Sequence, residues 1–139
     1  MFSGKSIHSI DAKGRIVLPA KFREELGNEF YLVQGFDNCC IQAMSVELYE
    51  SICAKILELP ANYSRALQYT FSGTAQNVSP NAQGRVLIPL SLRQFAMISD
   101  EALVIGMNNR IEIWNKEKFD EFMGTQQGNI AQAMSLLKF

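Results

Sequence analysis

Two short apolar runs closed by proline stand out in the hydrophobic pattern of the chain. The runs "RIVLP" (15–19) and "RVLIP" (85–89) each follow a polar turn that contains glycine, and they predict short strands. Apolar residues then recur at helical spacing in "AKFREELG" (20–27) and "LSLRQFAM" (90–97), where Gly27 can end the first helix. The pattern therefore predicts a strand followed by a helix at two places in the chain.

A tight hairpin is predicted after each of these helices. Asp37-Asn38 and Asn108-Asn109 separate two strand-like runs in each half of the chain. A two-residue hairpin turn needs positive φ, which Asn and Asp tolerate better than most residues. On the strands that follow the turns, Trp114 matches Met44 in position, and we predict that both side chains belong to the core.

Further helices are predicted after the hairpins. Ser45 can cap a helix that stops at Pro60. The predicted apolar face of this helix consists of Tyr49, Ile52, Cys53, Ile56 and Leu57. Phe119 and Phe122 hold the equivalent face in the second half, and residues 62–70 form another predicted helical segment.

The two halves of the chain are copies of one unit. Residues 11–25 match residues 81–95 at an offset of 70, with identities at Ala12/Ala82, Gly14/Gly84, Arg15/Arg85, Pro19/Pro89 and Arg23/Arg93. The sequence "FSG" precedes each copy, and "LVQGF" in the first half matches "LVIGM" in the second. We therefore divide the chain into repeat one (residues 1–70) and repeat two (residues 71–139).

Neither repeat has enough strands for a sheet of its own. We therefore expect the two copies to pair their strands around one shared core, with approximate two-fold symmetry and flanking helices. The predicted fold class is α+β. Such a fold would bring the two equivalent turns together on one surface.

The composition is that of a folded globular protein, because 47% of the residues are hydrophobic and 19% are charged. No apolar run approaches the ~18–20 residues of a membrane-spanning helix, and the first residues lack the apolar centre of a signal peptide, so we expect a cytoplasmic protein without a membrane partner. The three cysteines lack metal-ligand or redox spacing and are interpreted as reduced packing residues. With His8 as the only histidine, a His-rich metal site is excluded.

Positive charge is concentrated near the repeated runs. Residues 1–23 carry five bases against one acid, and residues 71–99 carry two bases and no acid. Because the whole chain has a net charge of −1, the remaining residues sum to −7. This separation is typical of an anion-facing surface on an otherwise acidic protein, although chance segregation of solvated charge would look the same.

The turn before each strand carries the candidate binding residues. In repeat one, Asp11 can accept backbone N–H bonds, Gly14 allows the chain to reverse, and Arg15 offers a planar fork of donors for phosphate or a guanine edge. Lys13 adds a charge at the tip of the turn. The corresponding residues of repeat two are Asn81, Gln83, Gly84 and Arg85.

The alternative for Arg15 is a salt bridge to Asp11 that only pins the turn. This alternative is weaker for Arg85, because Asn81 offers no charge. For Arg23 and Arg93, which follow the prolines, helix capping or a partly buried ion pair is favoured over a binding role.

The sequences "MFSGKSIHSIDAKGRIVLPAKFRE", "GRVLIP" and "LVIGMNNRIEIWN" resemble the MraZ family of bacterial transcriptional regulators. The family hallmark is a D-x-x-x-R motif in each half. Asp11 to Arg15 matches it, whereas the second copy reads Asn81 to Arg85, which puts the role of a second acidic residue in doubt. The resemblance implies an AbrB-like, swapped-hairpin fold in which the two halves form a pseudo-dimer.

The resemblance also implies a ring of about eight to twelve subunits. Such a ring would bind short direct repeats in a promoter and control, as a repressor, the cluster of division and cell-wall genes, in association with the nucleoid. Presenting weak modules many times would give avidity for tandem DNA repeats. The tail "NIAQAMSLLKF" is a candidate part of the assembly surface, because one helical face of it would carry Ile130, Ala133, Met134 and Leu137. The alternative is that this tail packs on its own subunit or frays.

Two other function classes are weaker alternatives. An AbrB-like protein-interaction module, such as a toxin-neutralising partner, is the alternative to a DNA-binding regulator. An enzyme is not expected, and neither is a cofactor, because no paired acid and base, phosphate-cradling loop or metal constellation occurs in the sequence.

Overall fold

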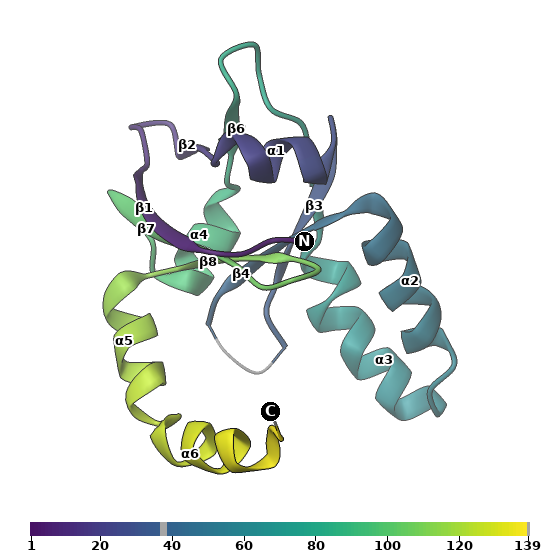
Figure 1. The fold of residues 1–139 in the computed structure, drawn as a ribbon. Helices are drawn as coiled ribbons and strands as arrows, with labels where there is room; N and C mark the ends of the chain where they lie inside the picture. The colour runs from purple at the N-terminus through teal and green to yellow at the C-terminus, as the bar shows by residue number, and fades with distance from the viewer. Residues whose placement is uncertain (37–38, 139) are drawn as a thin grey trace.

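The fold is described by a computed structural model of residues 1–36 and 39–138 (Figure 1). Repeat one contains β1 (Lys5–Ser9), β2 (Arg15–Val17), α1 (Ala20–Leu26), β3 (Phe30–Gln34), β4 (Ile41–Ser45), α2 (Val46–Leu57) and α3 (Ala61–Thr70). Repeat two contains the short 3₁₀ helix η1 (Ser72–Thr74), β5 (Gln76–Val78), β6 (Arg85–Leu87), α4 (Leu90–Ala96), β7 (Glu101–Gly106), β8 (Ile111–Trp114), α5 (Lys116–Gly124) and α6 (Gln127–Leu136). The predicted α+β class is confirmed.

The main sheet is built by exchange of strands between the repeats. Its six strands lie in the order β1-β7-β8-β4-β3-β5, and every neighbouring pair is antiparallel. Strand β1 of repeat one pairs with β7 of repeat two, and β5 of repeat two pairs with β3 of repeat one. Because equivalent strands occupy mirrored places in this order, the sheet has a pseudo-two-fold relation between β4 and β8. This is the swapped arrangement that the repeat predicts.

Strands β2 and β6 form a separate antiparallel ribbon. Ile16 pairs with Val86 at its centre, Arg15 pairs with Leu87, and Val17 pairs with Arg85. Only the central pair is buried, because successive residues of a strand point to opposite faces. The ribbon therefore turns one face toward the core and leaves the face that carries both arginines on the surface.

The core is divided by the main sheet. One face packs against the ribbon, α1 and α4, and this cluster contains Leu18 and Phe22 from repeat one beside Ile88 and Leu92 from repeat two. On the other face, α2 and α3 cover β3 and β4, and α5 covers β7 and β8 around the buried Trp114. Figure 1 shows α2 with α3 and α5 with α6 as two separate arms, both extending away from the ribbon. The ribbon thus rests on a core to which both repeats contribute.

Local signals in the sequence account for several element boundaries. The Ser45 hydroxyl accepts a hydrogen bond from the Leu48 N–H and caps α2 as predicted. Gly27 follows α1 with φ of 88°, as expected, and of the predicted turn pair in the β7–β8 hairpin Asn108 has a positive φ, of 65°, whereas Asn109 does not. The matching prediction for Asp37-Asn38 lies outside the described residues.

The predicted apolar face of α2 needs one correction. Ile56 is buried, but the next residue, Leu57, is 67% exposed at the end of the helix, so the buried face stops at Ile56. The helix ends three residues before Pro60, which instead precedes α3. The prediction that Leu57 belongs to the buried face of α2 is therefore wrong.

The C-terminal segment is helical as α6, and none of its residues is buried. Ile130 is 42% exposed and Met134 is 58% exposed. Packing of this face on its own subunit is therefore not observed. Among residues 1–36 and 39–138, no helix combines the length and the apolar character needed to cross a membrane.

Candidate nucleic-acid interface

The turn of repeat one is held by the Asp11 carboxylate. Its Oδ1 accepts hydrogen bonds from the backbone N–H groups of Lys13 (3.0 Å) and Arg15 (2.8 Å). The Asp11 N–H donates to the Arg15 carbonyl, and the Gly14 N–H donates to the Asp11 carbonyl. Gly14 has φ of 85°, which side chains other than glycine rarely tolerate. The predicted turn with Asp at its first position is present.

The turn of repeat two repeats this backbone network. The Asn81 Oδ1 accepts hydrogen bonds from the N–H groups of Gln83 (3.0 Å) and Arg85 (2.9 Å). The backbone bonds between Asn81 and Arg85 and between Gly84 and Asn81 are also the same. An amide oxygen and a carboxylate oxygen accept these bonds equally well in geometry, so the loss of the acid leaves the turn intact.

The two arginine side chains differ. Arg15 Nε donates to Asp11 Oδ2 at 2.8 Å, an ion pair whose side chains are 28% and 35% exposed. The hydrogen bond from the Arg15 backbone N–H and the nearby guanidinium lower the pKa of the Asp11 carboxyl. Arg85 is exposed and has no such bond to Asn81 within the described residues. The ion pair expected as the alternative for Arg15 therefore exists, and it leaves the amino groups of that guanidinium available to a ligand.

The ribbon brings the two turns to one surface. Arg15, Val17, Arg85 and Leu87 all lie on its outer face, opposite the buried central pair. Diagonal neighbours on such a ribbon are about 7–8 Å apart at Cα, so the two guanidinium groups can reach adjacent sites on one ligand. Val17 and Leu87 are 40% and 51% exposed. The outer face is therefore a small apolar surface between two cations.

His8 also lies on this surface, although the sequence analysis did not identify it as an interface residue. It lines a hollow of about 280 Å³ beside Arg15, Val17 and Arg85. A ring nitrogen lies 2.7 Å from the Ser6 hydroxyl, and partial burial lowers the pKa of the imidazole. The ring is thus predominantly neutral at pH 7. Strand β1 leads through the Asp11 turn into the ribbon, where Ile10 bridges Ile16, and it also pairs with β7, so both contacts place His8 here.

Arg23 and Arg93 lie behind the turns. Arg23 Nε donates to the Leu18 carbonyl at 3.1 Å, and Arg93 Nε donates to the Ile88 carbonyl at 2.9 Å. Neither side chain forms an ion pair with a described carboxylate. Of the two alternatives to a binding role, helix capping or a partly buried ion pair, the ion pair is absent among the described residues, and both arginines instead bond backbone carbonyls just after the ribbon strands.

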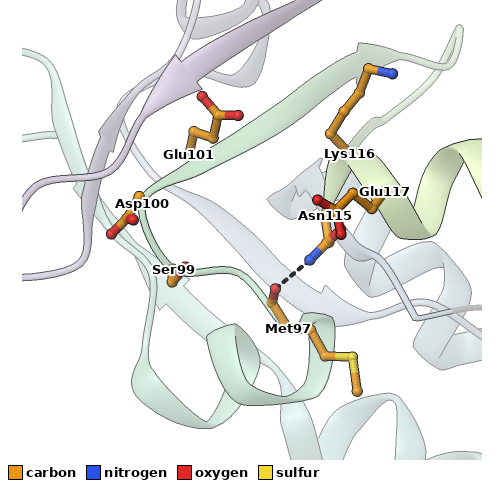
Figure 2. A pocket seen from close by; sticks show the side chains of 7 residues that line it. All are labelled: Met97, Ser99, Asp100, Glu101, Asn115, Lys116 and Glu117. Atoms are coloured by element: carbon orange, nitrogen blue, oxygen red, sulfur yellow. Dashed lines mark hydrogen bonds between the residues drawn. The ribbon is translucent and has the colours of Figure 1, made fainter.

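Another hollow, of about 480 Å³, has the opposite charge (Figure 2). It lies between the α4–β7 connection and the start of α5, where the Asn115 amide donates to the Met97 carbonyl at 2.7 Å. Asp100, Glu101 and Glu117 line it against a single lysine. This acidic lining is unfavourable for a polyanion, in contrast to the ribbon surface with Arg15 and Arg85.

The structure also bears on metal and nucleophile chemistry. Among the described residues, no three His, Cys, Asp or Glu side chains are grouped so that they could hold a metal ion. The cysteines form no disulfide there. Burial strongly raises the pKa of the Cys40 thiol, so Cys40 remains protonated.

Comparisons with known proteins agree with this architecture. The family model described as "MraZ protein, putative antitoxin-like" matches residues 1–68 and again residues 71–138. The chain is 38% identical over 143 residues to "Transcriptional regulator MraZ" of Acetivibrio thermocellus, covering 99% of both chains. It is 42% identical to the protein of that name from Finegoldia magna, over 88% of this chain and 86% of the relative. The protein of that name from Clostridium acetobutylicum is 40% identical over 99% of both chains.

Proposed function

The chain belongs to the MraZ family, and we propose that it is a transcriptional regulator that binds double-stranded promoter DNA through the ribbon and its two turns. The observation that carries the proposal is the register of β2 and β6. It sets Arg15 and Arg85 on one exposed face of a two-stranded ribbon. The relatives' shared name supports the regulatory role.

A two-stranded ribbon has the width that the major groove of B-DNA admits. In this position the guanidinium groups of Arg15 and Arg85 can bind guanine edges or phosphates, and Lys13 at the tip of its turn can reach a phosphate. Gln83 occupies the equivalent tip in repeat two and supplies a polar contact without charge. The backbone hydrogen bonds of the turns hold these groups in place before DNA arrives, which reduces the entropy lost on binding.

One subunit neutralises few phosphates, so its own affinity for DNA should be low. We propose that subunits assemble into a ring of about eight to twelve copies, which engages several direct repeats of a promoter at once and gains affinity through effective concentration. The exposed apolar residues of α6 support this assembly.

A ring seated on promoter repeats would occlude the polymerase. We therefore propose repression as the regulatory sign and the cluster of division and cell-wall genes as the target. The protein would then be found with the nucleoid in the cytoplasm. Mapping of the chromosomal DNA that the protein binds tests whether this gene cluster is the target. Transcript levels with and without the protein test whether it represses these genes.

The experiment that tests DNA binding measures affinity for a duplex with tandem repeats from the gene cluster's promoter, at several salt concentrations. We expect affinity to fall steeply with salt and to be lost in the Arg15→Ala/Arg85→Ala variant. Arg65→Ala, which removes an exposed arginine on α3, is the matched control and should bind normally. The proposal would be wrong if the wild type did not bind DNA at low salt. It would also be wrong if the Arg15→Ala/Arg85→Ala variant bound as well as the Arg65→Ala control.

A protein-interaction role is the second candidate. The family description "putative antitoxin-like" and the exposed apolar residues of α6 favour it. In that case a toxin-like protein partner would be held by the helical surface and not by the ribbon. This role would be supported if the wild type did not bind DNA and the Arg15→Ala/Arg85→Ala variant still retained a protein partner that copurifies with the wild type.

A further inference from the structure

Each turn of the interface is backed by an arginine from the other repeat. A Cβ atom placed on Gly14 would lie 2.6 Å from Arg93 Cζ, and one placed on Gly84 would lie 2.5 Å from Arg23 Nη1. Real Cβ atoms do not approach other atoms so closely. The guanidinium of repeat two therefore fills the space behind the turn of repeat one, and the guanidinium of repeat one fills the space behind the turn of repeat two.

Two hydrogen bonds connect Gly14 and Arg93 through the backbone of Ile88. The Ile88 N–H donates to the Gly14 carbonyl at 3.0 Å. The Ile88 carbonyl accepts the Arg93 Nε–H at 2.9 Å, and the Arg93 guanidinium returns to contact Gly14. Repeat two thus contacts the turn of repeat one through both Ile88 and Arg93.

The chemistry of this position suits arginine specifically. Nε donates to a carbonyl while the rest of the guanidinium reaches the glycine, a two-point arrangement that the single ammonium group of lysine cannot reproduce. Both arginines are half-buried without a carboxylate partner among the described residues. Taking charge from water costs free energy that no ion pair offsets here, which points to a role beyond packing.

We propose that Arg93 is the positioning residue of the Asp11–Arg15 turn and that Arg23 is the positioning residue of the Asn81–Arg85 turn. Each repeat thereby orients the binding arginine of the other. The effect on DNA rests on the proposed function, whereas the effect on turn geometry does not. Neither repeat alone could present an ordered turn.

The first experiment measures amide hydrogen exchange without DNA. In Arg93→Lys, we expect exchange at residues 13–15 to rise about tenfold while exchange at residues 83–85 is unchanged, because one charge-assisted bond and its planar contact are lost. Arg23→Lys is the matched control and should give the reverse pattern. A rise confined to the turn of the same repeat, equal rises in both turns, or no rise would overturn the proposal.

The second experiment is a crossed set of double variants in DNA binding. Arg93→Lys should weaken binding about tenfold in the wild type and in Arg85→Ala, but less than about twofold in Arg15→Ala, because coupled residues are not additive. Arg23→Lys should show the opposite dependence. If Arg93 instead contacted phosphate, binding would weaken with unchanged exchange in both turns, and the positioning role would be wrong.

Folding is monitored by circular dichroism in every variant. Arg93→Gln, which retains a polar side chain without the planar cation, is the second variant if Arg93→Lys does not fold. If both variants unfold, Arg93 is a residue of general stability and the proposal is overturned. If the wild type binds no DNA, the proposed function fails while the exchange measurement still decides the positioning role.

Discussion

The turns of the two repeats have the same backbone and differently restrained arginines. Asp11 and Asn81 accept the same two backbone N–H bonds, at distances that agree within about 0.1 Å. Only Asp11 also holds its arginine, through the Arg15 Nε bond. The comparison shows that the shape of the turn depends on a side-chain oxygen, whereas the order of the arginine depends on a negative charge.

This difference separates two roles within one motif. The first turn presents a guanidinium bonded to Asp11 beside Lys13, and the second presents a guanidinium that has no such bond among the described residues, beside Gln83. A fixed donor loses less entropy when it binds, and a second cation at the tip adds a phosphate contact. If the interface binds DNA, the first turn should therefore contribute more.

The largest expected effect comes from removing each arginine in turn. Arg15→Ala should weaken binding of a tandem-repeat duplex about 100-fold, and Arg85→Ala about tenfold, because the first contact is pre-ordered and charge-assisted. Fluorescence anisotropy at fixed salt measures both. Equal losses, or a larger loss for Arg85→Ala, would contradict the ranking of the turns.

The next effect separates shape from charge at Asp11. Asp11→Ala removes the acceptor of both backbone bonds and should lower the free energy of unfolding, as loss of a similar capping oxygen does. Asp11→Asn keeps the acceptor, so the free energy of unfolding should change little while DNA binding weakens about threefold through the freed Arg15. Denaturant unfolding and anisotropy measure the two effects. Equal destabilisation by Asn and Ala would show that the carboxylate charge, and not the oxygen acceptor, maintains the turn.

A smaller effect is expected at the tips of the turns. Lys13→Gln should reduce the magnitude of the slope of log affinity against log salt by about one for each turn engaged, with similar weakening across DNA sequences. Gln83→Lys is the matched change in repeat two and should increase the magnitude of that slope. An unchanged slope in Lys13→Gln would exclude a phosphate contact at this residue.

The smallest effect concerns pH and the Asp11 carboxyl. Its pKa is lowered in the folded protein from an ordinary value of 3.8, so its contribution to stability is complete above that value and is lost as pH falls through the lowered pKa. Asp11→Asn should remove this component. Denaturant unfolding of both proteins at a series of pH values between about 5 and 2 measures the difference. Curves that stay parallel throughout this range would show that Asp11 is not stabilised in its charged form.

Much of the local structure could be predicted because its causes lie within a few residues. The Ser45 cap, the Gly27 stop and both Asx turns each depend on one side chain and the adjacent backbone. The error at Leu57 has the same basis. Helical spacing identifies the apolar face of α2, but it does not show how far along the helix that face is covered.

The candidate site was predictable only in part. Repetition of the Gly-Arg pair identified Arg15 and Arg85, but the exposed Val17 and Leu87 beside them follow from the ribbon register. His8 lies at the site because β1 continues through the Asp11 turn into the ribbon, where Ile10 bridges Ile16, and because β1 pairs with β7. These positions depend on strand pairing and register, which periodicity does not encode.

By itself, the sequence determined the duplication, the turns and the α+β class, because these follow from local propensity and from identity between two segments. Tertiary structure alone decided which strands exchange, which face of the ribbon remains in solvent, and that Arg93 lies behind Gly14 while Arg23 lies behind Gly84. The physical reason is that one repeat cannot satisfy its own strand edges or bury its own apolar face. Each repeat is completed by the other, and the contacts that shape the interface run between them.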